Sequence, residues 1–478
     1  MSLLLFTQTP AFAVDMMDVY RVFYGAADCV LCDANSAQMT HLFFEEGRQY
    51  ETAFTYLGQS KKGAAPIPKG DALLQKRVQK RLIKQTLYDL LKVITGIHPP
   101  WGSLTGIRPT RLFYEQLARG LSMAEAEQTM QTEFDLHRDK AALLSAIVKT
   151  QSALPKPTDN QADIYIGIPF CTSLCAYCSF SSGEIGNGKL VAPYLEKLEI
   201  EMRDTAALMR DCGLALRALY IGGGTPTSLN EDQFQWLIDR MNFYFPSAVE
   251  TTVEAGRPDT LTLKKLKTLK SGGVNRISIN PQTFNDHTLK LIGRNHSAED
   301  VFNAYEMARD VGLHHINMDI IAGLPGETLR DFKYTLSCIR SLHPESLTVH
   351  TLALKRSSRL HLQGAALPDG AMTAGMVALG AEEAKGLGLT PYYLYRQKYM
   401  AGNQENVGYA KENHACLYNV DMMEETANIL GIGAGAMSKH VYSNESRIER
   451  APNVSDILTY LSRSDEMIKR KKLLWNRE

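Results

Sequence analysis

The stretch GIPFCTSLCAYCSF, residues 167–180, decides both the fold and the chemistry of this chain. It follows an apolar, strand-like segment and places Cys171, Cys175 and Cys178 in one short loop with the spacing CxxxCxxC. Thiolates are the usual ligands of iron–sulfur clusters, and three at this spacing can each bind a different iron of one cubane. A zinc site normally has four ligands, whereas Phe180 stands where a further cysteine could follow. The loop therefore predicts a 4Fe–4S cluster with one open iron; the alternative is an ordinary cysteine-rich core loop.

Beyond this loop, short apolar strands alternate with amphipathic helices. The strands are expected at 163–168, 218–221, 250–255, 275–280, 316–321 and 346–352. The helices are expected near 193–211, 231–244, 259–270, 298–311 and 328–341. Such alternation is typical of parallel strands with helices outside. We therefore predict an α/β fold, a partial (β/α)6 barrel resembling a TIM barrel, with its active site at the carboxyl ends of the strands.

A polar segment with two prolines, residues 151–163, indicates a linker before the barrel. We expect an additional α+β N-terminal domain over 1–155, the barrel over 156–355 and a C-terminal extension on the substrate side over 356–478. The N-terminal part shows strand-like patterns at 19–23 and 50–56 and a helical pattern at 72–94. The basic side of that helix is most simply a solvated face, although a surface for a polyanion is the other interpretation.

The overall composition excludes some function classes. Lys and Arg together number 52, as do Asp and Glu, so no global field favours nucleic acid or an anionic membrane. No apolar run approaches the roughly 18 residues of a membrane span, and the first residues lack the basic segment of a secretory signal; a cytoplasmic protein is expected. Eight cysteines are too sparse for a disulfide scaffold. Cys29 and Cys32 form a second CxxC, which by itself is a weak signal of redox or metal use.

The CxxxCxxC loop after a first strand resembles the hallmark of the radical S-adenosylmethionine superfamily. The longer string YIGIPFCTSLCAYC, residues 165–178, resembles the branch of anaerobic coproporphyrinogen III oxidases, whose members include HemN, HemW and HemZ. The resemblance implies that the open iron binds the amino and carboxylate groups of S-adenosylmethionine. It also implies an electron donor such as flavodoxin or ferredoxin, whose electron cleaves the sulfonium to methionine and a 5′-deoxyadenosyl radical.

Further positions match the cofactor-binding residues of this superfamily. The string IGGGTPT, residues 221–227, supplies Gly222, Gly223, Gly224 and Thr225, and glycines without Cβ let backbone approach a ligand closely. The other matching positions are Tyr165, Glu254, Gln282, Arg294, Asp319 and Met437. By resemblance, Asp319 binds the ribose hydroxyls and the backbone near Met437 flanks the adenine. Taken singly, each residue is more often a satisfied polar core residue than a ligand; together, in this order and at this spacing, they indicate the cofactor site. The string GIGAGAMS, residues 431–438, lacks the spacing of a dinucleotide-binding motif.

Two stretches resemble HemZ in particular, residues 102–112 (GSLTGIRPTRL) and 391–410 (PYYLYRQKYMAGNQENVGYA). The implied substrate is coproporphyrinogen III, a tetrapyrrole with four propionates. Arginine forks suit carboxylate recognition, and the candidates in these stretches are Arg108, Arg111, Arg396 and Lys398, followed after the sixth strand by Lys355, Arg356 and Arg359. For Arg108 and Arg111 a salt bridge between domains is the competing interpretation.

The predicted function is therefore the oxygen-independent oxidative decarboxylation of coproporphyrinogen III to protoporphyrinogen IX in haem biosynthesis. In the implied mechanism the radical is derived from the cofactor, so no residue acts as a general base for hydrogen abstraction. The alternative is a haem-binding chaperone resembling HemW, whose signature pairs a histidine and an asparagine with a later tyrosine and tryptophan. The stretch NHACLYN, residues 413–419, keeps the histidine and the tyrosine as His414 and Tyr418, but has Ala415 in place of the asparagine and Asn419 in place of the tryptophan. RNA modification would require a dedicated basic appendage, so no nucleic-acid partner is expected.

Overall fold

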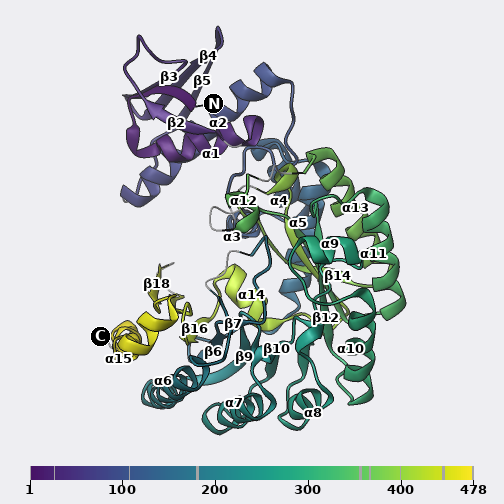
Figure 1. Cartoon of the computed structure of the whole chain (residues 1–478). Coiled ribbons are helices and arrows are strands. Elements are labelled where there is room, and N and C mark those ends of the chain that lie inside the picture. The colour runs from purple at the N-terminus through teal and green to yellow at the C-terminus, as the bar shows by residue number, and fades with distance from the viewer. Residues whose placement is uncertain are drawn as a thin grey trace. The chain divides into compact units, whose positions relative to one another are not determined.

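The computed structural model divides into two compact units, which are described separately. It describes residues 2–25, 27–70, 72–106, 108–178, 182–354, 358–364, 368–398, 400–443 and 447–475. The first unit comprises Met1–Ser145 with Arg396–Tyr399, and the second comprises Ala146–Tyr395 with Met400–Glu478 (Figure 1). The division falls inside helix α5 (Arg138–Ser152). The domain boundaries that we predict at residues 155 and 355 stay predictions.

The first unit contains a mixed five-stranded sheet with the strand order β2-β1-β3-β4-β5. Its strands are β1 (Ser2–Thr7), β2 (Asp28–Leu31), β3 (Met39–Glu46), β4 (Gln49–Tyr56) and β5 (Gln59–Pro66). Its helices are α1 (Ala13–Tyr24), α2 (Ala72–Thr95), α3 (Pro109–Ala118), α4 (Met123–Phe134) and the first part of α5. The core lies where α1 and α2 bury apolar side chains against the sheet, around Leu5, Met39 and Leu87.

Two of the local predictions for this unit are confirmed and one is wrong. The helix at 72–94 and the strand at 50–56 are present as α2 and β4. The strand-like pattern at 19–23 belongs instead to helix α1. Met16, Val19, Tyr20 and Phe23 are buried at the spacing of one helix face, and a short apolar run cannot by itself distinguish this spacing from a strand.

The second unit is built on an eleven-stranded sheet with the order β14-β15-β13-β12-β11-β10-β9-β6-β16-β17-β18. Its parallel series is β6 (Gln161–Ile168), β9 (Ala215–Gly223), β10 (Glu250–Glu254), β11 (Arg276–Ser278), β12 (Ile316–Ala322) and β13 (Ser346–Thr351). Consecutive members of this series are neighbours, and helices connect them. The predicted partial barrel and its strands are confirmed.

In sequence order, helices connect each parallel strand to the next (Figure 1). They are α6 (Val191–Asp211), α7 (Glu231–Tyr244), α8 (Leu263–Ser271), α9 (Asp286–Leu291), α10 (Ala298–Asp310) and α11 (Leu329–Leu342). Several begin with a capping box, as in α7, where the Asn230 side chain accepts from the Gln233 amide. These caps fix where the capped helices begin, and because the strands are parallel, the loops that precede the helices all leave the sheet at the same edge.

The remaining elements extend the sheet at both ends. The short helix α12 (Arg359–Leu362) and α13 (Gly370–Gly386) are followed by β14 (Thr390–Tyr395) and β15 (Asn406–Ala410). Strand β15 pairs antiparallel with β13, and β14 pairs antiparallel with β15 at the edge of the sheet. After α14 (Leu417–Glu424), β16 (Asn428–Ile432) pairs parallel with β6, and β17 (Met437–Tyr442) and β18 (Arg447–Pro452) follow antiparallel. Helix α15 (Ile457–Trp475) packs on α6. None of the helices in the described ranges has the length and apolar character that crossing a bilayer requires.

Candidate functional site

The cysteine loop leaves the carboxyl end of β6 and is held by its own backbone. Short strands β7 (Phe170–Cys171) and β8 (Gly183–Glu184) pair within it, and the Ile185 amide donates to the Cys171 carbonyl at 2.8 Å. The Cys178 amide donates to the Cys175 carbonyl at 3.1 Å, and the Ala176 amide to the Ile292 carbonyl at 2.9 Å. Among the side chains that the structure describes, no three potential ligands are gathered for a metal ion. Backbone hydrogen bonds therefore set the shape of the loop that carries the three thiols.

The glycine motif after β9 is joined directly to this loop. The Gly224 amide donates to the Ile168 carbonyl at 2.8 Å and the Thr225 amide donates to the Phe170 carbonyl at 2.7 Å. The Thr225 hydroxyl donates to the Cys171 sulfur at 3.6 Å. Burial raises the pKa of the Cys171 thiol, an effect that the Thr225 hydroxyl opposes. Two segments predicted to serve one site are therefore in contact.

Glu254 lies against the same glycines from the end of β10. A Cβ on Gly222 would lie 2.7 Å from the Glu254 carboxyl carbon, so any larger residue would displace the carboxylate. Gly223 has φ of +110°, which disfavours other residues. The Tyr220 hydroxyl donates to Glu254 Oε1 at 2.8 Å. Burial raises the pKa of Glu254 to about 7, although the bonds from Tyr220 and the Gly223 amide favour the ionised form.

The end of β11 presents buried polar atoms that have no protein partner. Within the described part of the chain, Ser278 Oγ, Asn280 Oδ1 and Gln282 Oε1 are buried without a hydrogen bond. Gln282 has φ of +66°, and its backbone is fixed because its amide donates to the Asp319 carbonyl at 2.9 Å. Buried polar atoms without partners are uncommon, and strained backbone clusters at ligand sites. These atoms fit a polar ligand at the predicted position of S-adenosylmethionine.

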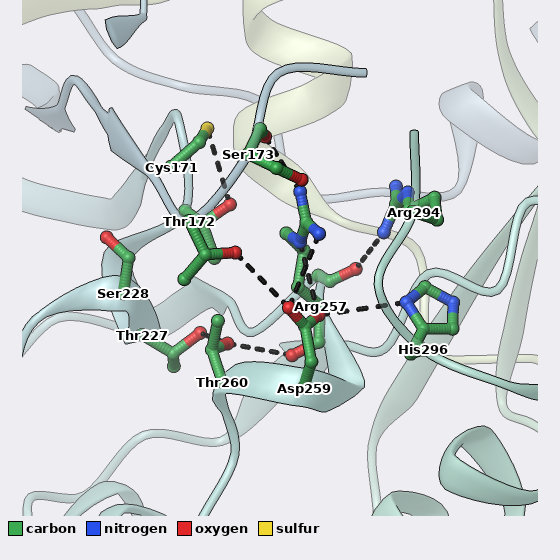
Figure 2. Close-up of polar contacts among 12 residues, drawn as sticks. Cys171, Thr172, Ser173, Thr227, Ser228, Arg257, Asp259, Thr260, Arg294 and His296 are labelled. Carbon is green, nitrogen blue, oxygen red and sulfur yellow. Dashed lines mark hydrogen bonds and ion pairs between the residues drawn. The ribbon is translucent and has the colours of Figure 1, made fainter. Parts of the chain in front are cut away.

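Arg294 connects the strand ends with the cysteine loop. Its Nη1 donates to the carbonyls of Gly256 at 3.0 Å and Asn280 at 3.3 Å, and its Nη2 donates to the Tyr177 hydroxyl at 3.3 Å. Figure 2 shows this side chain on the same side of the loop as His296. The guanidinium is buried, so the structure places a fixed positive charge beside the residues between Cys175 and Cys178.

Asp319 lies on β12 and faces His350 of β13. Asn317 Nδ2 donates to Asp319 Oδ1 at 2.8 Å, and His350 Nε2 lies 3.6 Å from Oδ2. Burial acts to raise the pKa of Asp319, but His350 and Asn317 outweigh it, and the pKa lies below its usual value. A carboxylate held in its ionised form can accept bonds from two ribose hydroxyls, as the acidic residue of dinucleotide-binding folds does.

Tyr165 forms a stack of tyrosine rings with residues that the sequence did not single out for this purpose. Its ring centroid lies 6.3 Å from that of Tyr220 and 6.1 Å from that of Tyr418, and the last two lie 4.6 Å apart. Tyr165 and Tyr220 are also paired in register between β6 and β9. The alternation of inward positions on these strands could have predicted Tyr220, but Tyr418 comes from α14, far along the chain. His350 and Asn280 likewise lacked a sequence signal beyond their position near strand ends.

The small-residue segment before Met437 is held by a buried charge network. Glu201 of α6 accepts from the Gly433 amide at 2.8 Å, Asn453 Nδ2 at 2.8 Å and Lys471 Nζ at 2.6 Å. Lys471 Nζ also donates to the Gly431 carbonyl at 2.8 Å. Glu201 and Lys471 are 0% and 1% exposed. Met437 opens β17 directly after this segment, so the ion pair fixes the backbone expected beside the adenine.

The basic residues predicted to bind propionates differ in their surroundings. Arg108, Arg111, Arg396 and Lys398 all belong to the first unit, whereas the cysteine loop belongs to the second. Arg396 is buried, donates to the Leu104 carbonyl at 2.6 Å and lies over the Trp101 ring. Lys398 pairs with Asp18 at 2.9 Å, and Arg111 lies 4.0 Å from Glu115. Their role toward a substrate stays a prediction.

Arg359, predicted as a propionate-binding residue after the sixth strand, contacts the cysteine loop. Its Nη2 donates to the Leu174 carbonyl, immediately before Cys175. The side chain is otherwise exposed, so it lies at the surface of the site rather than in the barrel core. Lys355, Arg356 and Phe180 lie outside the described residues.

The types of donor fit the cofactors that the sequence predicts. Although the three thiols are not gathered into one group, they stand on one short loop held by backbone hydrogen bonds and are the donors that a cubane takes. The glycine motif, the Glu254 and Asp319 carboxylates and the buried polar atoms after β11 lie at the same edge of the sheet. A partial parallel barrel with this loop after its first strand defines a radical S-adenosylmethionine protein. A family model described as the radical SAM superfamily matches residues 165–339. HemZ of Bacillus subtilis, named an oxygen-independent coproporphyrinogen-III oxidase-like protein, is 40% identical over 405 residues, covering 82% of this chain and 80% of HemZ.

The chain belongs to the radical SAM superfamily, in the branch that contains HemZ and HemN. This membership implies a 4Fe–4S cluster and S-adenosylmethionine. The heme chaperone HemW of Bacillus subtilis is 42% identical over 210 residues, which cover 41% of this chain and 54% of HemW. The oxygen-independent coproporphyrinogen III oxidase of Salmonella typhimurium is 33% identical over 223 residues, covering 46% and 47% of the two chains. The structure of HemN from Escherichia coli shares the fold, with a TM-score of 0.53 at 24% identity, over 69% of this chain and 73% of HemN.

Proposed function

We propose that this protein converts coproporphyrinogen III to protoporphyrinogen IX without oxygen. The observation that carries the radical chemistry is the contact between the cysteine loop and the glycine motif, through Thr225 and Cys171, beside the Glu254 carboxylate. The substrate rests on the similarity to HemZ, which covers 82% of this chain and therefore extends beyond the barrel.

In this proposal Cys171, Cys175 and Cys178 hold the cluster. When bound, the cluster and S-adenosylmethionine supply the radical that removes a hydrogen from the β-carbon of a substrate propionate. The chain's own residues would bind and orient: Glu254 would accept a hydrogen bond from the amino group of the methionyl part, and Asp319 would accept hydrogen bonds from the ribose hydroxyls. The stacked tyrosine rings lie beside this site, where the Tyr220 hydroxyl donates to Glu254, and would limit the access of water to it.

The deciding measurement is an anaerobic turnover assay. The reconstituted protein is given reductant, S-adenosylmethionine, coproporphyrinogen III and a one-electron acceptor, because each decarboxylation releases one electron together with carbon dioxide. Protoporphyrinogen IX and 5′-deoxyadenosine are then quantified. We expect both products, with two decarboxylations for each macrocycle. Deoxyadenosine without porphyrin product would refute the proposed substrate but retain the radical chemistry.

A haem chaperone is the second candidate, because HemW of Bacillus subtilis is similar to part of this chain at 42% identity. It differs from the first candidate in one observable property. A chaperone would bind haem tightly in a one-to-one ratio and form no protoporphyrinogen IX, so haem titration of the same preparation separates the two.

We predict that Arg108→Ala raises the KM for coproporphyrinogen III about tenfold. Loss of one charge-assisted contact to a propionate costs on the order of 1.5 kcal/mol, which corresponds to about that factor. S-adenosylmethionine cleavage without substrate should be unchanged. Arg119→Ala is the matched control, since Arg119 follows the same helix and donates to Gln116 in the first unit. An unchanged KM in the Arg108 variant would remove this residue from the substrate site.

We also predict that S-adenosylmethionine binds about tenfold more weakly at pH 6 than at pH 8. The pKa of Glu254 is raised by burial to about 7, so the carboxyl is mostly ionised at pH 8 and mostly protonated at pH 6. The ionised carboxylate accepts a hydrogen bond from the ligand's amino group much more strongly than the neutral acid does. Equilibrium binding to the cluster-loaded protein measures the effect.

Glu254→Gln is the control for this pH dependence. Its affinity should be low and lack the step near pH 7. The pH dependence of the folding stability gives a second check. Because folding raises the pKa of the Glu254 carboxyl, its protonated form stabilises the folded protein below about pH 4.5, and this contribution to the free energy of unfolding is lost as the pH rises through 7. The ligand-free Glu254→Gln variant should therefore be more stable than the wild type at pH 8. If the S-adenosylmethionine affinity of the Glu254→Gln variant changed between pH 6 and pH 8 as much as that of the wild type, the assignment of Glu254 would be contradicted.

A further inference from the structure

We propose that Arg257 and Asp259 are positioning residues that hold the turn between Cys171 and Cys175 in the shape required for cluster binding. Both belong to the GRPD segment, residues 256–259, directly after β10. The inference rests on the proposed cluster site, but its test is made without iron.

The two residues contact the cysteine loop at two consecutive positions (Figure 2). Arg257 Nη1 donates to the Ser173 carbonyl at 2.8 Å. The Thr172 hydroxyl donates to Asp259 Oδ2 at 3.2 Å. Thr172 and Ser173 are two of the three residues that separate Cys171 from Cys175. One backbone carbonyl and one side chain of the turn are therefore fixed from outside the loop.

Arg257 and Asp259 also hold each other. Arg257 Nε donates to Asp259 Oδ1 at 3.2 Å and its Nη2 donates to Oδ2 at 3.3 Å. Arg257 is 3% exposed, whereas the Asp259 side chain is partly exposed, so the arginine side of the pair is the one shielded from competing water. An arginine fork can bind a carboxylate with two nitrogens and still direct its third toward a carbonyl, which a lysine cannot do. The pair therefore acts as one rigid group toward the loop.

The backbone that carries this pair is fixed in turn. The Thr260 hydroxyl donates to the Arg257 carbonyl at 2.7 Å, and the Thr227 and Thr260 hydroxyls lie 2.6 Å apart. Lys265 Nζ donates to the carbonyls of Thr227 at 2.7 Å and Thr260 at 2.9 Å. On the other side of the turn, the Ser173 hydroxyl donates to the Gly293 carbonyl at 3.0 Å. The turn is thus held between two fixed segments, and removal of Arg257 frees one side of it.

The test measures thiol alkylation in the iron-free protein. Wild type, Arg257→Gln and Arg276→Gln are treated with iodoacetamide under reducing conditions, and the rate at each cysteine is read by peptide mass spectrometry. Arg276 is the matched control, because it is also 3% exposed and lies 3.5 Å from a carboxylate, that of Glu250. It stands at the amino end of β11, whereas Arg257 follows the carboxyl end of β10, and it donates to the His414 carbonyl rather than to the cysteine loop. We expect Cys171, which is buried, to react about tenfold faster in Arg257→Gln because local opening exposes it. It should react at the wild-type rate in Arg276→Gln.

Two further variants separate positioning from general destabilisation. Asp259→Asn keeps the shape and loses the charge, so a smaller acceleration at Cys171 is expected. Arg257→Lys restores one donor and should partly restore the protection. Equal acceleration in Arg257→Gln and Arg276→Gln, or none in either, would overturn the inference. If the wild-type protein binds no iron, the proposed function fails, while the alkylation rates still decide this inference.

Discussion

Replacing Cys175 with alanine is expected to abolish both cluster binding and 5′-deoxyadenosine formation. Three thiolates leave one iron open, whereas two would leave the cubane without enough ligands to stay intact. Cys175 lies at the centre of the loop, where its carbonyl accepts from the Cys178 amide and Arg359 holds the preceding carbonyl. The measurements are iron and sulfide content, visible absorbance and deoxyadenosine yield after anaerobic reconstitution.

Cys212→Ala is the control for this substitution. Cys212 follows helix α6 in the same unit and is partly exposed, so its loss should leave iron content and deoxyadenosine yield at wild-type values. A Cys175→Ala protein that kept its full cluster and its activity would refute the proposed site, and with it the radical chemistry.

Replacing Lys471 with methionine is expected to lower the free energy of unfolding by about 3 kcal/mol. The methionine leaves the Glu201 carboxylate buried without its cation, and removal of one member of a buried ion pair costs roughly 3–5 kcal/mol. We place the effect at the lower end because Glu201 still accepts from the Gly433 amide, Asn453 and the Tyr460 hydroxyl. Urea unfolding of the ligand-free protein measures the loss.

The double variant Glu201→Gln/Lys471→Met separates the ion pair from packing. It removes both charges and keeps most of the volume, so it should recover a large part of the stability that the single variant loses. Hydrogen exchange at Gly431–Ala436 should be faster in the single variant than in the double variant. If the two variants unfold at the same urea concentration, the buried carboxylate is not the source of the instability.

The sequence predicted the barrel well because its parallel strands are short, mostly buried segments rich in apolar residues. Strand β6, for example, ends in IYIGI, in which Ile164, Ile166 and Ile168 are fully buried, and the amphipathic helices between the strands have a different period. The N-terminal unit was harder to predict. Val19–Phe23 has the composition of a strand, and only the longer helical face with Met16 shows that it belongs to α1.

The candidate site was predictable where function requires a particular residue at a particular spacing, as in the cysteine loop and the glycine motif. Its supporting residues were not. Arg257, Glu201 and Lys471 act through contacts between segments that are far apart in the sequence, and no local pattern distinguishes a buried charge from a solvated one. The tyrosine stack has the same origin, since Tyr418 reaches Tyr165 only after the sheet has formed.

The pairing of β16 with β6 has a consequence for biosynthesis. Strand β6 leads into the cysteine loop, and one of its two neighbours in the sheet, Asn428–Ile432, is translated long after β6 itself. Until those residues leave the ribosome, β6 has an open hydrogen-bonding edge, and the segment that contacts Glu201 is missing. We therefore expect iron–sulfur delivery to follow the synthesis of β16, and nascent chains stalled before residue 428 to acquire no cluster.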